Sequence, residues 1–538
     1  MSVKKLILPA VAATALAGGV AGYLYFNGAT GDSATPLGIA KVIPNQAYMA
    51  AFIATDEKNW AKLKQFGTPE AHQAVDKSLQ EFQQKMLTET SVDADKDLKP
   101  WVGNLMVAVM PSANLKEPDV VMAIAIKDKA SALSFANKFK SGAKVKNTET
   151  DYKGVKINQL VGEKSKKPIY TAVLKESYLM LSSNKTAIEQ SIDTLQGSPS
   201  FATKLEATPQ SSQTDNGDAP VARFYLPDYA GMVQAMSSKS RTPMDTSTLE
   251  QLKRVKSVVG TVSIDDVGLR LKGAVMVDPK TAIDYKTSPG KVVAQFPTDT
   301  FALVSGANLD SYWSQMAAQA KDSPQEKQVV DTMRGGSQMI GLDLDKEIFS
   351  WMNGEFAIGM MPLSQGILGQ LGFGGAMVFS TSDRKTADAT LSKLDTIAKS
   401  QSLAIVERNV NGKKVTEWKT PQGALLGHGW LDNNTVFIAT GDQLVTTLSS
   451  QTNPSLETSD SFKAVTASLP KQNIGYFYVD VEKTMTLINR VTSVSQKSAM
   501  NPEATAILNS IKGFGGTTTP TDKATSQFEA VLALNPAK

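Results

Sequence analysis

Few residues in this chain are of types that carry acid–base, nucleophilic or metal chemistry. It has two histidines, His72 and His428, and no cysteine. An ordinary zinc site takes several Cys or His ligands, and both disulfides and thiolate chemistry need cysteine. Neither histidine is accompanied by the Gly-x-Ser-x-Gly turn of a serine hydrolase. We therefore predict no catalytic residue of these types, no metal and no cofactor.

The segment 93–97 has an aspartate at every second position, as a calcium-binding loop does. Such a loop also needs a glycine at its sixth position and a bidentate glutamate at its twelfth, where this chain has Leu98 and Asn104. We instead interpret the acids as helix caps. Asp95, and Asp345 in a similar segment, are expected to cap short helices that each place a tryptophan in the core.

Three weaker signals leave one enzymatic alternative open. Ser288 and Lys291 have the serine-to-lysine spacing of penicillin-binding enzymes, but a proline stands between them rather than a helix start. The glycines of segment 372–375 are not followed by a helix of the dinucleotide-binding type. Two carboxylates distant in sequence can still meet in space, so a hydrolase using dispersed carboxylates stays an alternative.

An apolar, glycine-rich segment at residues 360–373, here called the apolar loop, joins two expected strands. It is too apolar for a hairpin tip that faces only water. Either it is tucked under a neighbouring helix, or it is a glycine-hinged contact for a membrane surface or a partner protein. The contact residues of the second interpretation are Met360, Met361, Leu363, Ile367, Leu368, Leu371 and Phe373.

A second unusual stretch, residues 127–167, holds eleven lysines and four acids. It is either the solvated face of a helix and a hairpin or a weak anion-attracting patch. The chain's net charge of +4 is small, and neither arginine bias nor interleaved aromatics suggest nucleic acid. The lysines that would face an anionic surface are Lys144, Lys146, Lys153, Lys156, Lys164, Lys166 and Lys167.

Both stretches belong to a chain that repeats its own pattern at an offset of roughly 250 residues. A repeat of this length indicates two copies of a whole domain rather than a solenoid unit. The end of the second copy, at residues 517–523, resembles the closing hairpin of the first only poorly. Features that match are explained by the fold, so function is sought where the copies differ. The matched positions are Pro44 and Pro297, Trp60 and Trp313, Trp101 and Trp351, Pro111 and Pro362, Gly154 and Gly412, Tyr225 and Tyr478, and Pro279 and Pro536.

The pattern of apolar residues predicts the elements that position these stretches. Strands grouped in hairpins, with helices between the groups, indicate an α+β fold made of two tandem copies of a mainly antiparallel sheet domain with packed helices. Helices are predicted over 129–139 and 186–195, and an earlier helix has an apolar stripe that predicts core contact. The stripe comprises Ala71, Ala74, Val75, Leu79, Phe82 and Met86. Strands are predicted over 47–53, 105–110, 120–126, 154–160, 170–174, 178–182, 221–226, 258–264 and 269–277.

The N-terminus carries Lys4 and Lys5 and then an uncharged run over residues 6–26. At about 1.5 Å a residue this run can cross a hydrocarbon core of about 30 Å. A signal peptide cleaved after Ala17, which would export the body, is the alternative. We favour an uncleaved anchor because the run continues past that site and ends in aromatic residues. The predicted segments are a transmembrane anchor (1–26), a tether (27–40), a first repeat (41–283), a linker (284–290) and a second repeat (291–538).

The order of these elements resembles a cyanobacterial family of membrane-anchored, duplicated proteins whose domain has no known function. The likeness lies in the anchor ending at Phe26, the starts at Pro44 and Pro297, and the acid-to-tryptophan helices before Trp101 and Trp351. The resemblance implies a photosynthetic bacterium and a body in the periplasm or thylakoid lumen, and an uncleaved anchor would leave Lys4 and Lys5 in the cytoplasm. It implies no activity.

These observations predict a non-enzymatic protein that binds a protein partner or helps to assemble a membrane complex. The membrane is contacted through the N-terminal helix. A lipid or apolar-ligand binding protein is an alternative, in which paired sheets enclose a hydrophobic cavity and the apolar loop touches the bilayer.

Overall fold

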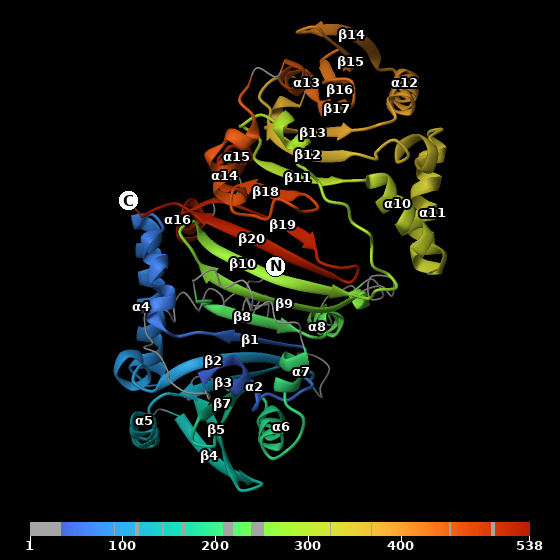
Figure 1. Cartoon of the computed structure of the whole chain (residues 1–538). Coiled ribbons are helices and arrows are strands. Elements are labelled where there is room, and N and C mark those ends of the chain that lie inside the picture. Colours follow the sequence, from blue (N-terminus) through green and yellow to red (C-terminus); the bar gives the residue numbers. More distant parts are fainter. Residues whose placement is uncertain are drawn as a thin grey trace. The chain divides into compact units, whose positions relative to one another are not determined.

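The computed structural model contains two compact units (Figure 1). Unit 1 comprises residues up to Asp278 together with Ala537, and unit 2 comprises Pro279–Pro536. The predicted anchor and most of the tether, residues 1–33, lie outside the described residues. Among the helices that are described, none has the length and apolar character needed to span a membrane. The structure describes residues 34–90, 92–112, 118–142, 145–162, 168–207, 219–237, 252–322, 324–366, 368–450, 453–495 and 501–537.

The described strands of unit 1 form one antiparallel sheet. Their spatial order is β10-β9-β8-β1-β2-β3-β7-β6-β5-β4. All predicted strands are present, and the lysine-bearing strand β4 was missed because its exposed, polar sequence lacks an apolar face. The strands are β1 (Met49–Ile53), β2 (Val102–Met110), β3 (Asp119–Ile126), β4 (Val145–Tyr152), β5 (Val155–Gly162), β6 (Ile169–Leu174), β7 (Tyr178–Ser182), β8 (Ala222–Leu226), β9 (Val255–Ile264) and β10 (Gly268–Val277).

The described strands of unit 2 form an antiparallel sheet of the same topology. Their order is β20-β19-β18-β11-β12-β13-β17-β16-β15-β14, which is the order of unit 1 with ten added to each label. The strands are β11 (Ala302–Ala307), β12 (Glu355–Pro362), β13 (Phe373–Ser380), β14 (Ala404–Val410), β15 (Lys413–Thr420), β16 (Gly423–Trp430), β17 (Thr435–Thr440), β18 (Tyr476–Asp480), β19 (Ile511–Pro520) and β20 (Thr525–Leu534).

The register of the central strands also agrees between the units. Ala50 lies opposite Tyr225 in unit 1, and Leu303 lies opposite Tyr478 in unit 2. The predicted α+β class with antiparallel sheets is therefore correct. The closing hairpin of the second half, whose sequence matches that of the first only poorly, is complete, because β19 and β20 pair along their length. β-Branched threonines at 517–519 suit a strand, and ladder hydrogen bonds do not depend on side-chain type.

Helices cover the sheet of each unit. In unit 1 the main core packs β-strand residues such as Met106 and Met180 against Ile39 of α2 and Ile188 of α6. The predicted stripe on α4 is buried at Ala71, Ala74 and Leu79. The helices of unit 1 are α2 (Pro36–Ala40), α3 (Glu57–Trp60), α4 (Pro69–Thr90), α5 (Lys129–Gly142), α6 (Lys185–Leu195), α7 (Ala202–Ala207) and α8 (Tyr229–Ser237).

In unit 2, helices α12 and α13 cover opposite faces of the sheet. Leu391 of α12 packs with Phe379 and Val436, whereas Val445 of α13 lies against Gly427. Successive residues of a strand point to opposite faces, so one strand region serves both helices. The helices of unit 2 are α10 (Leu309–Gln319), α11 (Pro324–Met339), α12 (Arg384–Ser400), α13 (Gly441–Ser450), α14 (Asp460–Thr466), α15 (Val481–Ser495) and α16 (Pro502–Asn509).

The alternating acids cap one-turn π-helices, η4 (Ala94–Leu98) and η8 (Leu344–Ile348), but the capping residue differs from the prediction. Asp93 and Asp343 accept hydrogen bonds from the second and third backbone N–H groups of these turns. The predicted caps, Asp95 and Asp345, lie two residues further on, inside the turns. The prediction failed because alternating acids do not reveal which residue still has extended backbone angles.

The same turns position the paired tryptophans. Trp101 donates through Nε1 to Asp97 O at 2.6 Å, and Trp351 donates to Glu347 O at 3.0 Å. Both indoles are buried, as predicted. Each unit thus uses one acid-capped turn to fix one core tryptophan.

The segment predicted as the linker, residues 284–290, lies within unit 2. Ser288 is buried and donates to Oε1 of Glu355 at 2.8 Å, and the N–H of Gly290 donates to the same oxygen. A buried carboxylate requires such donors, so this contact fixes the start of unit 2 against β12.

Candidate functional site

The lysine-rich stretch forms α5 and the exposed β4–β5 hairpin. Lys153 donates to Asp193 at 2.6 Å and Lys156 pairs with Glu149 at 2.7 Å. Lys146 lies exposed on β4. The two ion pairs reduce the positive potential of the hairpin. The other predicted anion-facing lysines, Lys144, Lys164, Lys166 and Lys167, lie outside the described residues.

The apolar loop is attached to helix α13. The backbone N–H groups of Ser364 and Gln365 donate to Oε1 of Gln443 at 3.0 and 3.1 Å. Met361 and Leu363 are completely buried. The beginning of the loop, at Met361–Gln365, is therefore packed against helix α13 instead of projecting into solvent.

The remaining predicted contact residues of the loop differ in exposure. Leu371 is 55% exposed and Met360 is 36% exposed. Leu368 and Phe373 are half-buried, and Ile367 lies outside the described residues. A surface contact of the loop would thus depend mainly on Leu371 and Met360.

Met360 belongs to a wider exposed surface on the sheet of unit 2, here called the apolar sheet face: Val304, Ile358, Met360, Phe477 and Phe514. Val304 lies opposite both Ile358 and Phe477, and Met360 lies two residues from Ile358 on the same face. The Phe477 and Phe514 rings meet edge to face with centroids 5.1 Å apart. Val304 is 53%, Ile358 43% and Phe514 39% exposed.

The equivalent surface of unit 1 is buried at Val107 and Val109 and half-buried at Ala51 and Phe224. Val107, opposite Ala51 as Ile358 is opposite Val304, is only 6% exposed. In the next row Met49 and Val109 pack against Met232 of helix α8. The two units therefore share these strands but treat this face differently, because unit 2 leaves large apolar side chains in contact with solvent.

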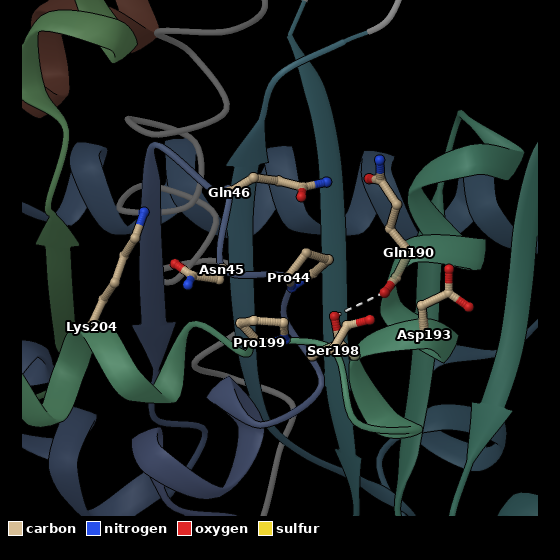
Figure 2. Close-up of a pocket in the computed structure, with 9 residues that line it drawn as sticks. Pro44, Asn45, Gln46, Gln190, Asp193, Ser198, Pro199 and Lys204 are labelled. Atoms are coloured by element: carbon tan, nitrogen blue, oxygen red, sulfur yellow. Dashed lines mark hydrogen bonds between the residues drawn. The ribbon is translucent and has the colours of Figure 1, made fainter.

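A cleft of about 550 Å³ lies in unit 1, and Figure 2 shows its lining. Three segments form it: the turn before β1, helix α6, and residues 198–204, which run from a loop into α7. A hydrogen bond from Ser198 N to Asp193 O, 3.0 Å long, joins the second segment to the third. Sequence reasoning missed this cleft because no single segment carries a recognisable motif. The lining residues are Pro44, Asn45, Gln46, Gln190, Asp193, Thr194, Ser198, Pro199 and Lys204.

The side chains of the cleft are mainly amides and charged groups. Lys204 is half-buried, and this burial lowers the pKa of its ammonium group. Asp193 is the carboxylate in the lining. The cleft thus offers neither the two facing acids of a glycosidase-type hydrolase nor the apolar walls of a lipid cavity.

The contacts of the two histidines are of the kind that hold secondary-structure elements together. His428 Nε2 lies 2.8 Å from Oδ1 of Asp395, and Trp418 Nε1 donates to the same oxygen at 2.6 Å. These contacts attach α12 to strands β15 and β16. His72 lies against Gly67 at the start of α4. Within the described ranges no cluster of three or more His, Asp or Glu side chains is arranged to hold a metal ion.

The fold defines a two-unit α+β protein with antiparallel sheets. The chain belongs to the family described as Protein of unknown function (DUF3352), whose model matches residues 9–534. A comparison with curated proteins finds no match.

Solved structures of TP0453 give weak matches. Crystal form IV aligns with 9% identity and a TM-score of 0.25, over 44% of this chain and 79% of that chain. Crystal form III gives 9% identity and a TM-score of 0.24 over the same shares. Such low scores carry no inference about the fold or function of this chain.

Proposed function

We propose that this protein is a non-enzymatic, extracytoplasmic membrane protein that binds a protein partner through the apolar sheet face of unit 2. The observation that carries the proposal is the exposure of Val304, Ile358, Met360 and Phe514 on one face of a sheet whose counterpart in unit 1 is buried or half-buried. Contiguous exposed apolar surface on a folded domain is typical of an interaction site. Binding would bury these side chains and gain the hydrophobic energy that unit 1 gains within its own core.

A protein suits this face better than a bilayer. The side chains stand on hydrogen-bonded central strands, whereas insertion into lipid requires a protruding element. Residues 291–538 hold 21 Lys and Arg against 23 Asp and Glu, a balance that gives no attraction to anionic headgroups. Both edges of strands β11 and β12 are already paired, so the partner would pack on the face rather than add a strand.

We further propose that the units are copies of one duplicated domain. The identical strand order, the agreeing register and the paired tryptophans support this. The anchor over residues 1–26, the location in the periplasm or thylakoid lumen, and the cyanobacterial origin are proposals supported by the sequence. An anchored body would meet membrane-bound partners at raised local concentration.

Site-specific photo-crosslinking in native membranes tests the partner. A photoreactive residue would replace Ile358 in one variant and Val406 in another; Val406 is also exposed and apolar but lies on β14, away from the apolar sheet face. We expect one protein species to be crosslinked at position 358 and not at 406. The crosslink should disappear in Val304→Glu. Identical products at both positions, or none at either, would contradict the proposal.

The lipid-binding alternative is favoured by one observation, the 55% exposure of Leu371 in the apolar loop. Co-sedimentation with neutral phosphatidylcholine vesicles tests it, using Leu371→Ser with Val406→Ser as the matched control. Loss of co-sedimentation only in Leu371→Ser would favour a lipid contact. Equal behaviour of the two variants would remove it.

A further inference from the structure

We propose that helix α11 of unit 2 is a self-association site, which packs antiparallel against the same helix of a second copy of this chain. The contact surface, here called the α11 ridge, comprises Val329, Met333, Gly336 and Ile340. It shares no residue with the apolar sheet face, so this proposal and the proposed function can fail independently.

The residues of the α11 ridge lie on one side of the helix. They are spaced by four, three and four positions, which an α-helix of about 3.6 residues per turn brings into one line. Ile340 directly follows the last helical residue, and the chain end around it is fixed. The N–H of Gly341 donates to Gln338 O, and that of Leu342 donates to Ser337 O, both at 2.9 Å. With Gly341 at a φ of 78°, this is a Schellman ending, so Ile340 extends the line of the helix.

The ridge leaves large apolar side chains in solvent although α11 also has a side that faces the core. On that side Val330, which is 2% exposed, packs with Trp313 of the neighbouring helix α10 (Figure 1). On the ridge Val329 is 47%, Met333 43% and Ile340 52% exposed. A surface helix ordinarily has polar residues outside its core-facing stripe. A second apolar side on the same helix is therefore typical of an interaction site.

Gly336 has no role within unit 2 that requires a glycine. A Cβ at this position would meet no atom within 4 Å, and the backbone does not have the positive φ that favours glycine. Glycine in a helix interior is destabilising relative to alanine, so the fold alone would favour a larger residue. What Gly336 provides is a hollow on the ridge between Met333 and Ile340, which a side chain of another helix can enter.

The ridge is complementary to itself. In an antiparallel pair whose two-fold axis passes between residues 334 and 335, Met333 of one copy lies opposite Gly336 of the other. Val329 then lies opposite Ile340. The long, flexible methionine fills the glycine hollow, and two branched side chains meet at each end. The two-fold axis repeats both contacts, as an isologous interface requires.

Charge also favours an identical partner. The four ridge residues are uncharged, so two copies meet without repulsion between like charges. Lys327 pairs with Asp331 one turn further along α11. Arg334 pairs with Asp345 at 2.7 Å. A strongly acidic or basic partner would therefore find these charges already engaged within unit 2.

Disulfide trapping tests the proposal, because the chain has no cysteine of its own. Full chains carrying Val329→Cys or Ile340→Cys are expressed alone or together, and the cells are treated with a permeant oxidant. Co-expression should give a disulfide-linked dimer. Either variant alone should give little, because the antiparallel pair places identical positions further apart than the roughly 7 Å that a disulfide can bridge. Val406→Cys co-expressed with Ile340→Cys measures chance collision, since Val406 is exposed on β14.

Gly335 supplies a matched control for Gly336. A Cβ at Gly335 also meets no atom within 4 Å, but one step along the helix turns it about 100° away from the ridge. Gly336→Leu should reduce the mixed dimer about tenfold or more, because its side chain occupies the space that receives Met333. Gly335→Leu should leave the mixed dimer unchanged. Both changes raise helix propensity, so α11 should be retained in both.

Three results would overturn the proposal. The first is no mixed dimer above the chance level set by Val406→Cys, which is the result expected if a bilayer or a different protein covers the ridge. The second is as much dimer from Val329→Cys or Ile340→Cys alone as from the two together. The third is an equal yield of mixed dimer in Gly336→Leu and Gly335→Leu. A single helix pair buries less than the about 1,200 Å² of a stable interface, so the supporting result is a weak, reversible dimer that oxidation traps.

Discussion

Unit 1 and unit 2 share one sheet topology but differ in what they leave exposed. Both sheets have the same strand order, and both place a tryptophan through an acid-capped turn. Unit 1 buries the strand face around Val107 and has a polar cleft between charged sides. Unit 2 exposes Ile358 on the matching face. Shared features therefore maintain the fold, whereas the differences mark surfaces that are free to specialise.

The largest expected effect concerns the shared tryptophans. Trp101→Ala and Trp351→Ala should each destabilise their own unit by about 3–5 kcal/mol, because each removes a buried indole and leaves a cavity. Hydrogen exchange of β2 and β12 measures the two units separately. Equal loss of protection in both units from either variant would show that they unfold together and would break the comparison.

The capping aspartates should have a smaller effect. Asp93→Ala and Asp343→Ala are each expected to cost about 1 kcal/mol, since two backbone N–H groups lose their acceptor. Urea denaturation measures the loss, and Asp93→Asn and Asp343→Asn should retain most of the stability. Asp95→Ala is the comparison that separates the observed cap from the one expected from sequence, and it should be nearly neutral.

Acid should affect unit 2 through Asp345. Hydrogen bonds from Arg334, 2.7 and 2.8 Å long, lower the pKa of Asp345. A carboxylate with a lowered pKa adds stability above its unfolded pKa, about 3.9, and this is lost as the pH falls through the lower folded value. The contribution is at most about 1 kcal/mol because the pair is partly exposed. The midpoint temperature of thermal unfolding should therefore fall less steeply between pH 6 and pH 2 in Arg334→Gln than in the wild-type chain. An unchanged slope would exclude this role for Asp345.

The smallest effect on stability is expected from giving the apolar sheet face of unit 2 a residue found at the equivalent position of unit 1. Val304→Ala gives unit 2 the residue that unit 1 has at position 51 and should change stability by less than about 0.5 kcal/mol, because Val304 is exposed. It should nevertheless reduce the crosslink from position 358. A large loss of stability would mean that Val304 serves the fold, and the contrast between the faces would lose its functional meaning.

Sequence patterns predicted the apolar strands better than the polar strands and the helix caps. Alternating apolar residues located the predicted strands to within a few residues, because a half-buried strand must alternate. The lysine-bearing strand β4 escaped because its exposed, polar sequence has no apolar face. The threonine-rich part of β19 matches the first copy poorly in sequence, yet it pairs with β20 through backbone hydrogen bonds. The capping aspartate was misplaced by two residues because capping depends on backbone angles.

The candidate sites were also predicted only in part from the sequence. Met360 was found as an unusual apolar residue, yet its neighbours on the sheet face, Val304 and Phe514, come from other strands and looked like ordinary strand residues. A strand that is apolar on both faces, such as β12, is a signal that could have revealed the surface. The cleft between Asp193 and Lys204 left no such signal.

The sequence by itself determined the α+β class, the paired tryptophans and most strands of unit 1, because these follow from local periodicity and from residues repeated at a constant offset. Only the tertiary structure decided that Leu363 is buried while Leu371 is exposed, that Ile358 faces solvent while Val107 does not, and that Asp193 and Lys204 line one cleft. Burial and proximity depend on which segments distant in the chain pack together, and that information belongs to no single segment.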